Sequence, residues 1–322
     1  MPTIISKFSR IFVSLFAISM SGIVSGGAIT TVTVPGALET YLVGISNNGV
    51  AVGFYVDSSG NTHGLEVLAN GTLVYPFDDP NGATTTAFFG VNNSGTIVGY
   101  DSSNSLPAIQ SFILSGGVYG VFSIPGCGSP FIPAGIHDIN DSGDVAGSCG
   151  PSLVSGYIQT SGNAPVVFTL PGALDVDAEG INNLDQVVGE YVTPSGTTRG
   201  YGFIRNADGT YTLVDYPGGV YSTAFSGIND AGVLVGDWRD FSSNIYAFYG
   251  TPGNFIPFSI SGETEVTLSG INNSDEVVGT YVDSSFVLHG FITTLATPEP
   301  SSALLFMAGA LVLAVLKVSR RA

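Results

Sequence analysis

The chain has 322 residues, of which 44 are glycine and 44% are apolar, while only 10% are charged. Low charge with high apolar content excludes a disordered chain, and abundant glycine suits short strands joined by tight turns. Residues 29–294 carry three basic and 24 acidic residues, a formal charge of −21, and a surface this acidic excludes nucleic-acid binding because it repels phosphate.

The first 28 residues have the three parts of a secretory signal peptide. Lys7 and Arg10 form a basic region, and Ile11–Met20 is a short apolar stretch. Gly26 and Ala28 are the small residues required before a cleavage site after Ala28. The alternative is a transmembrane anchor, but this stretch is too short for a hydrocarbon core of about 30 Å. We expect the segment to direct export and to be removed.

Residues 29–296 contain degenerate copies of a core of the form Gly-Ile-Asn-Asn-x-Gly-x-Val-Val-Gly-x-Tyr. Six copies begin at Gly44, Gly90, Asp138, Gly180, Gly227 and Gly270. Their closing glycines are Gly53, Gly99, Gly147, Gly189, Gly236 and Gly279, which lie 42 to 48 residues apart. This period indicates a repeat protein in which each unit covers the hydrophobic face of the next one.

Each repeat contains four strand-like pieces. The first shows period-two alternation before a turn such as Pro35-Gly36, and the second runs into the core. The third carries the paired apolar residues before the closing glycine. The fourth follows a small residue and centres on Leu65, Phe112, Tyr157, Phe203, Phe248 and Phe291. Four strands per unit predict a propeller blade, so the six units predict an all-β, six-bladed β-propeller.

The repeat core resembles the HAF-type extracellular repeats of bacteria over nearly all of residues 30–294. The resemblance implies a propeller. The alternative is a β-solenoid, whose coils are usually shorter than these repeats and whose ends need polar caps.

The two ends of the repeat region hold complementary halves of one strand pair. The region starts with a first-type strand at Thr31–Val34 and stops after a fourth-type strand at His289–Thr294. Pairing Thr31–Val34 with Phe291–Thr294 would remove two open sheet edges. We expect this pair to close the ring.

Cys127 and Cys149 are the only cysteines of the chain. Because export places them in an oxidising compartment, we expect a disulfide, the alternative being two separately buried thiols.

A calcium site is one interpretation of the third repeat. Asp138, Asn140, Ser142 and Asp144 alternate along a tight glycine turn, as in half of a calcium loop. Asp175, Asp177 and Glu179 give a second hint of this kind. The alternative is ordinary turn chemistry, since neither segment has an acid at the twelfth position. We expect no other cofactor.

An aromatic column follows the closing glycines at Tyr55, Tyr191, Trp238 and Tyr281. These side chains could stack on sugars, but we expect them to fill gaps between blades. His63 and His289 share a repeat position whose residue type varies, which favours a structural role. The sequence has no nucleophile elbow, metalloprotease motif or phosphate loop.

Residues 297–322 form a tail of three parts: Pro298-Glu299-Pro300, an apolar run from Ala303 to Leu316, and the basic residues Lys317, Arg320 and Arg321. A helix over this run would rise about 21 Å, enough for a membrane stop with the cations left in the cytoplasm. The tail resembles the PEP-CTERM sorting signal of Gram-negative bacteria. This resemblance implies processing by an exosortase and delivery to the cell surface or the exopolysaccharide matrix.

We therefore expect a protein that is secreted across the inner membrane, transiently anchored by its C-terminal helix, and released to the surface or matrix. A non-enzymatic structural or exopolysaccharide-binding role fits an acidic surface, which suits cations, neutral glycans or simple solubility. The alternative is a propeller-based glycan hydrolase or lyase, whose candidate acids are Asp138, Asp144, Asp175 and Asp237.

Overall fold

The structure, a computed structural model, describes residues 27–296 apart from residues 81–83, 103–108, 125–127, 130–131, 134, 151–154, 195–198 and 219. Regular structure in this range consists of β-strands, and the range contains no helix able to cross a membrane. Most of the expected signal peptide, the sorting tail at 297–322 and Cys127 lie outside the described residues.

Three separate sheets each contain four consecutive antiparallel strands. The first sheet consists of β12 (Gly135–Ile139), β13 (Val145–Cys149), β14 (Ser155–Gln159) and β15 (Val166–Phe168). The second consists of β16 (Asp175–Ile181), β17 (Val187–Val192), β18 (Gly200–Arg205) and β19 (Tyr211–Val214). The third consists of β20 (Ser222–Ile228), β21 (Leu234–Arg239), β22 (Ile245–Thr251) and β23 (Asn254–Pro257).

The remaining long strands form one 12-stranded sheet, in which two single parallel bridges, Glu39 with Leu288 and Thr62 with Thr85, separate antiparallel groups. One group consists of β2 (Glu39–Ile45), β3 (Ala51–Val56), β4 (Thr62–Val67) and β5 (Leu73–Phe77). The next consists of β6 (Thr85–Val91), β7 (Ile97–Ser102), β8 (Ile109–Ser115) and β9 (Val118–Phe122). The last consists of β24 (Thr264–Ile271), β25 (Glu276–Val282), β26 (Leu288–Thr294) and β1 (Thr30–Val32).

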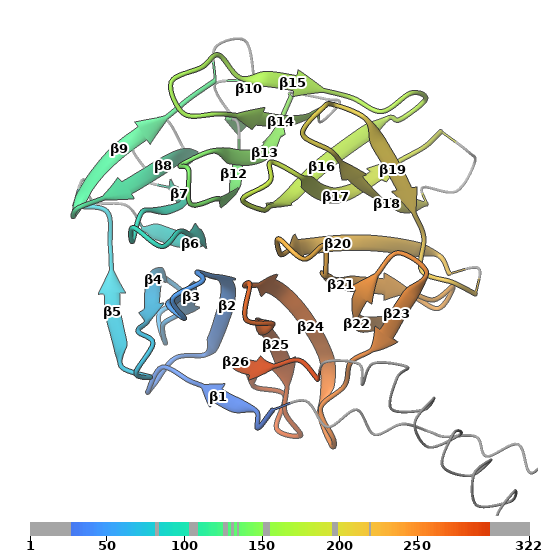
Figure 1. The fold of residues 1–322 in the computed structure, drawn as a ribbon. Helices are drawn as coiled ribbons and strands as arrows, with labels where there is room; N and C mark the ends of the chain where they lie inside the picture. The colour runs from blue at the N-terminus through green and yellow to red at the C-terminus, as the bar shows by residue number, and fades with distance from the viewer. Residues whose placement is uncertain are drawn as a thin grey trace, which may run out of the picture.

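The four-stranded groups stand around a common centre (Figure 1). The innermost strands are β2, β6, β12, β16, β20 and β24. This arrangement is a β-propeller, so the predicted fold class is confirmed at that level. A short hairpin of β10 (Gly128–Ser129) and β11 (Ile132–Pro133) was not predicted, because it lies in an insertion outside the repeat pattern.

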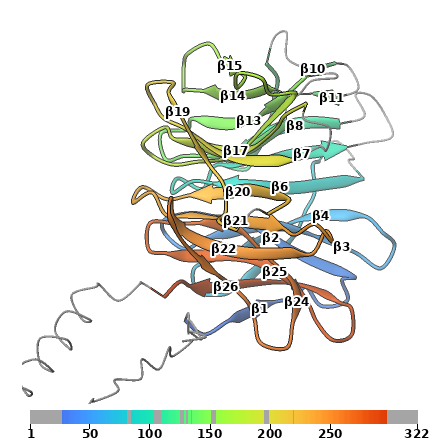
Figure 2. The ribbon, with the colours of Figure 1, turned by 90° about the vertical axis from the view of Figure 1, so that its right-hand side faces the viewer.

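The predicted pairing of the two ends of the repeat region is confirmed, but it covers Thr30–Val32 and Gly290–Ile292 rather than Thr31–Val34 and Phe291–Thr294. Strand β1 lies antiparallel to β26, with Thr31 opposite Phe291 and Val32 opposite Gly290 (Figure 2). Side chains also link this segment to the sheet, because the Thr31 hydroxyl lies 2.9 Å from the hydroxyl of Tyr281 on β25 and the Thr33 hydroxyl lies 2.8 Å from Nδ1 of His289 on β26. The N-terminal strand therefore completes the C-terminal group as its fourth, outermost strand.

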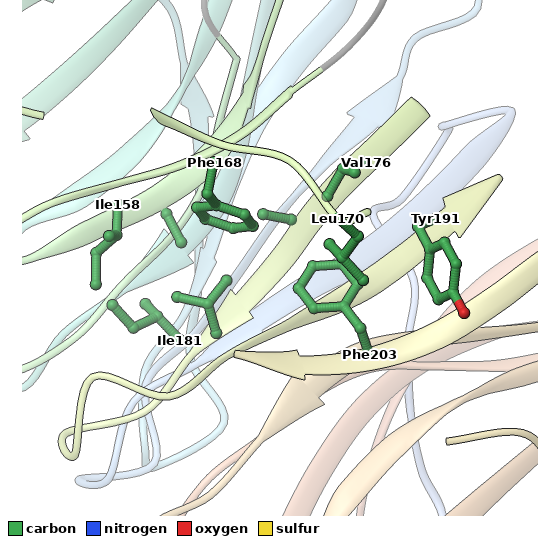
Figure 3. Close-up of a cluster of buried hydrophobic side chains, with 10 residues drawn as sticks. Ile158, Phe168, Leu170, Val176, Ile181, Tyr191 and Phe203 are labelled. Atoms are coloured by element: carbon green, nitrogen blue, oxygen red, sulfur yellow. The ribbon is translucent and has the colours of Figure 1, made fainter. Parts of the chain in front are cut away.

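Apolar side chains from neighbouring sheets form the core. Ile158 and Phe168 of one sheet pack with Ile181 and Phe203 of the next (Figure 3). The six predicted fourth-strand residues, from Leu65 to Phe291, are at most 1% exposed. Full burial of each such side chain contributes about 1.5–3 kcal/mol, so contact between sheets dominates the stability.

Glycines next to these residues permit the contact. A Cβ atom on Gly202 would lie 2.4 Å from the Phe225 ring, and one on Gly290 would lie 2.9 Å from Leu42. Phe225 and Leu42 both belong to the innermost strand of the next four-stranded group. The expected role of the small residues, close approach of sheets, is confirmed.

We predict that Val32→Asp destabilises the protein by about 3 kcal/mol or more, because it places a carboxylate in the buried seam between β1 and its neighbours. Val32 is 5% exposed, whereas Thr30 on the same strand is exposed and Thr30→Asp is the matched control. Chemical denaturation of the full chain measures both changes. Equal stability of the two variants would contradict the role of this strand.

Candidate functional site

Every innermost strand carries a bulge at the same repeat position, directly before the first residue of the repeated core. The unpaired residues are Val43, Phe89, His137, Glu179, Ser226 and Ser269. A bulge breaks the ladder and turns its side chain away from the normal alternation. All of these residues line one cavity of about 320 Å³ at the centre of the ring. The cavity is the candidate site.

The repeated core supplies the rest of the cavity wall. An apolar layer consists of Ile45, Val91, Ile139, Ile181, Ile228 and Ile271. Beyond this layer the innermost strands end in the Asn-Asn turns, which border the cavity through side chains such as Asn47, Asn183 and Asn273. The cavity wall therefore has three layers: the unpaired bulge residues, then the apolar residues of the repeated core, then the asparagines of the turns.

Hydrogen bonds link successive turns into a ring, which we call the amide ring. Its first set joins the side-chain Nδ2 of Asn92, Asn140, Asn182, Asn229 and Asn272 to the backbone oxygen of the equivalent residue in the next copy, the last bond reaching Ser46. In the same residues Oδ1 accepts two backbone N–H groups of its own turn. One asparagine thus holds a turn and ties it to its neighbour.

The second turn residue extends the amide ring. The backbone N–H of Asn93, Asp141, Asn183, Asp230 and Asn273 donates to the side chain of the next copy over 2.7–2.9 Å. The ring changes only in the first copy, where Ser46 replaces asparagine. There Asn48 makes the link through bonds of 3.0 and 3.2 Å to Asn93.

Glycine at the start of each core lets the innermost strands meet. A Cβ on Gly44 would lie 2.4 Å from the Phe89 carbonyl oxygen, and one on Gly270 would lie 2.7 Å from that of Val43. The third copy has Asp138 instead, and its carboxylate accepts the N–H groups of Ile139 and Ile181 at 2.8 and 3.0 Å. Burial raises the pKa of Asp138 to about 7.

His137 lies among two carboxylates of the neighbouring strand β16. Its Nδ1 is 3.2 Å from Glu179 Oε2, 3.8 Å from Asp177 Oδ1 and 3.0 Å from the Ala178 carbonyl oxygen. The Ser148 hydroxyl donates to Asp177 Oδ1 and accepts the Ala178 N–H at 3.0 Å. In the described part of the chain, His137, Asp177 and Glu179 are the one group of three such side chains close enough to share an ion.

The charges of this cluster act on one another. Burial would lower the pKa of His137, but the charge of Glu179 and its hydrogen bond outweigh burial and raise that pKa to about 9. Burial raises the pKa of Asp177, whereas His137 overcomes burial at Glu179 and lowers its pKa. Burial, followed by Asp177 and Asp237, raises the pKa of Glu190 to about 7. This side of the site concentrates acidic groups.

One aromatic side chain, that of Phe89, lines the cavity. The Phe89 ring lies 5.3 Å from Tyr100, which is outside the lining, and meets His137 edge to face at 6.1 Å. The cavity thus combines one aromatic ring with carboxylates and hydroxyls, a composition typical of small-molecule sites.

The residues proposed for calcium are engaged in the turn and its surroundings. Asn140 Oδ1 accepts the N–H groups of Ser142 and Asp144, and Asp144 Oδ1 accepts that of Ser161 at 2.6 Å. Both carboxylate oxygens of Asp138 accept backbone N–H groups, those of Ile139 and Ile181. Calcium binding here stays a prediction. Cys149 is disulfide-bonded, while Cys127 lies outside the described residues.

Of the acids proposed for the enzyme alternative, Asp138 lines the cavity, whereas Asp144, Asp175 and Asp237 are not among its lining residues. The structure therefore does not bring these four carboxylates together in one wall.

The aromatic column packs as expected. Tyr55, Tyr191 and Tyr281 are each 8% exposed. Tyr55 and Tyr191 stack on their cross-strand partners, as Tyr191 does on Tyr201 at 5.3 Å, and Tyr281 meets His289 at a tilt of 36°. Trp238 lies 4.2 Å from Tyr246 in the same arrangement.

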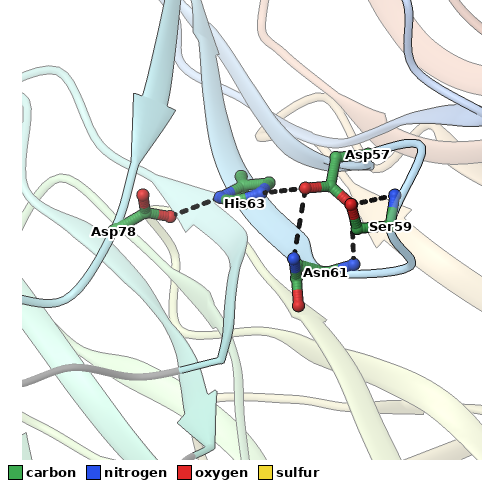
Figure 4. A network of polar contacts seen from close by, with 5 residues as sticks. All are labelled: Asp57, Ser59, Asn61, His63 and Asp78. Atoms are coloured by element: carbon green, nitrogen blue, oxygen red, sulfur yellow. Dashed lines mark hydrogen bonds and ion pairs between the residues drawn. The ribbon is translucent and has the colours of Figure 1, made fainter.

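His63 belongs to a network outside the cavity (Figure 4). Its ring nitrogens lie 2.6 Å from Asp78 and 3.3 Å from Asp57, which also accepts hydrogen bonds from Ser59 and Asn61. Burial would lower the pKa of His63, but the two carboxylates outweigh it and raise the pKa. This histidine holds a hairpin, in line with the structural role expected.

Sequence reasoning missed Phe89 and His137, and it read Glu179 only as part of a calcium hint. One signal could have found them: the position before each repeated core differs in residue type from copy to copy, although its surroundings repeat. A position that the scaffold does not specify is free to face a ligand.

No protein-family model and no curated protein matches this chain. Among solved structures, a subtype N10 neuraminidase-like protein of A/little yellow-shouldered bat/Guatemala/060/2010 shares 11% identity at a TM-score of 0.49, covering 84% of this chain and 98% of that one. The β-propeller domain of the Trilobed protease from Pyrococcus furiosus shares 9% at 0.48, covering 80% and 94%. A mutant Aleuria aurantia lectin in complex with alpha-methyl-L-fucoside shares 9% at 0.44, covering 84% and 99%. Similarities this low carry no inference about activity.

We predict that Asn229→Ala costs about 2 kcal/mol of unfolding free energy, because Asn229 is 3% exposed and its loss removes a buried bond to the Asn272 carbonyl oxygen together with the acceptor of two N–H groups of its own turn. Asn163→Ala, in an exposed turn, is the control and changes stability by less than about 0.5 kcal/mol. Urea denaturation of the full chain measures both. Similar values for the two would argue against the amide ring.

We predict that His63→Gln destabilises the protein more at about pH 5.5 than at about pH 8.5. Since the folded-state pKa of His63 is raised, its contribution is complete below the unfolded pKa and is lost as the pH rises through the folded one. The pKa of Asp57 is lowered, so its carboxylate is already ionised at the lower of these pH values. The difference is about 1 kcal/mol or less, or about 2–4 °C in Tm.

The control for this pH series is Asn61→Ala, which removes an uncharged partner of Asp57 and lowers Tm equally at both pH values. A loss at His63 that does not depend on pH would contradict the assigned charge pairing.

Proposed function

We propose that this chain is an exported, non-enzymatic surface or matrix protein whose four-stranded groups are the six blades of one closed propeller, and that it binds a polysaccharide in the axial cavity. The single observation that carries the binding proposal is the bulge layer. A bulge in every innermost strand places one unpaired residue of each repeat at the cavity wall.

The wall chemistry supports a sugar as the ligand. Phe89 offers a ring for the apolar face of a pyranose, while Ser226, Ser269 and Glu179 offer hydrogen-bond partners for hydroxyl groups. A volume of about 320 Å³ is at the small end for ligand pockets, which suits one or two sugar units at the end of a chain. The lining residues include no lysine or arginine, so neutral sugars are favoured over polyanionic ones.

Export and sorting form the second part of the proposal. The signal at residues 1–28 and the tail at 297–322 support passage through the inner membrane, transient anchoring and exosortase processing. The disulfide at Cys149 supports an oxidising destination. Release of the C-terminal segment, measured by mass spectrometry in cells with and without an exosortase, tests this part separately.

We predict that Phe89→Ala weakens binding to a neutral matrix polysaccharide at least about tenfold, a loss of about 1.4 kcal/mol, because it removes the one aromatic ring among the lining residues. Phe241→Ala is the matched control, since Phe241 is 77% exposed and does not line the cavity. Affinity electrophoresis in a panel of polysaccharides measures both variants.

The same panel is analysed for new reducing ends and unsaturated products. Wild-type protein that cleaves a polysaccharide would replace the binding proposal with the hydrolase or lyase alternative. A wild type that binds no polymer, or a Phe241→Ala loss equal to that of Phe89→Ala, would overturn the cavity as the binding site.

A further inference from the structure

We propose that His137, Asp177 and Glu179 bind one divalent transition-metal ion of the zinc type at the wall of the axial cavity. The inference concerns a different ligand from the polysaccharide and does not depend on it. It begins from geometry: His137 Nδ1 lies 3.2 Å from Glu179 Oε2 and 3.8 Å from Asp177 Oδ1, and one ligand atom from each residue lies within 4.8 Å of the other two.

These separations are close to what one ion requires. Zinc binds imidazole nitrogen and carboxylate oxygen at about 2.0–2.2 Å, so two ligands of a tetrahedral ion lie about 3.4 Å apart. The side chains would therefore need to move by only a fraction of an ångström to about one ångström. The Ala178 carbonyl oxygen, 3.0 Å from the same nitrogen, is close enough to act as a further oxygen donor.

The backbone holds two of the three ligands in place. His137 and Glu179 are the unpaired residues of two bulges, on β12 and on the adjacent β16. Asp177 precedes Glu179 by two residues on the same strand, and both carboxylates lie within 3.8 Å of the same imidazole nitrogen. The ion would thus connect two neighbouring sheets of the ring, and the equivalent residues Val43, Phe89, Ser226 and Ser269 explain why only this pair of copies has the donor set.

Surrounding groups fit a metal centre with open positions. Ser148 donates to Asp177 Oδ1 and so fixes the carboxylate, as outer partners of metal ligands do. His137 and Glu179 both line the cavity, which leaves space for water or a ligand oxygen on the ion. One imidazole with two carboxylates selects zinc and related ions over calcium or magnesium, which prefer oxygen alone.

The experiment titrates untagged, chelator-treated full-length protein with ZnCl2 by calorimetry. We expect one ion per chain in the wild type. His137→Gln weakens binding by more than about 100-fold, beyond the effect of an outer partner, and Ser148→Ala weakens it by about tenfold. His63→Gln is the control, because His63 also lies between two aspartates but is not among the residues that line the cavity. We expect this variant to bind Zn2+ as tightly as the wild type does.

A Co2+ titration gives a readout of coordination rather than affinity. Wild type and His63→Gln give visible absorption bands typical of a low-coordinate Co2+ ion, and His137→Gln and Glu179→Gln do not. If His137→Gln does not fold, the Zn2+ affinities of Glu179→Gln and Ser148→Ala test the proposed ligands in its place. Absence of stoichiometric Zn2+ binding in the wild type would overturn the proposal, as would equal binding by Glu179→Gln or tighter binding of CaCl2 than of ZnCl2.

Discussion

Close contact between innermost strands around one axis is the constraint on which this molecule depends. Glycine at the start of five of the six repeated cores leaves room for this contact, and in the third copy the Asp138 carboxylate accepts backbone N–H groups of Ile139 and Ile181 instead. The asparagines that follow then join neighbouring strands by hydrogen bonds that are shielded from water, where such bonds are strongest. The apolar cores between sheets add most of the free energy, but the glycines and the amide ring decide how many strands can share the centre.

Much of the fold could be predicted from the sequence because it repeats. The alternation before each turn and the large residues of the fourth strands indicated four-stranded units, and Thr31–Val34 with Phe291–Thr294 indicated how the ring closes. The hairpin β10–β11 could not be predicted, because its two short strands match no other copy of the repeat.

The site was harder to predict than the scaffold. The Asn-Asn pairs lie in local turns, whereas the bond from Asn229 to Asn272 crosses between copies 43 residues apart. A bulge adds one residue to a strand and leaves no residue signature of its own. His137 and Glu179 are 42 residues apart, and only the ring brings them within 3.2 Å.

The bulges also bear on how such a protein can change over evolutionary time. A residue in a bulge has no cross-strand partner, so its replacement does not disturb a ladder pair or a core contact. Six such positions around one cavity form a set that mutation can vary copy by copy while the repeats themselves stay under selection for folding. Gene duplication of the repeat would supply the scaffold once, and drift at these positions would supply new recognition properties at little cost in stability.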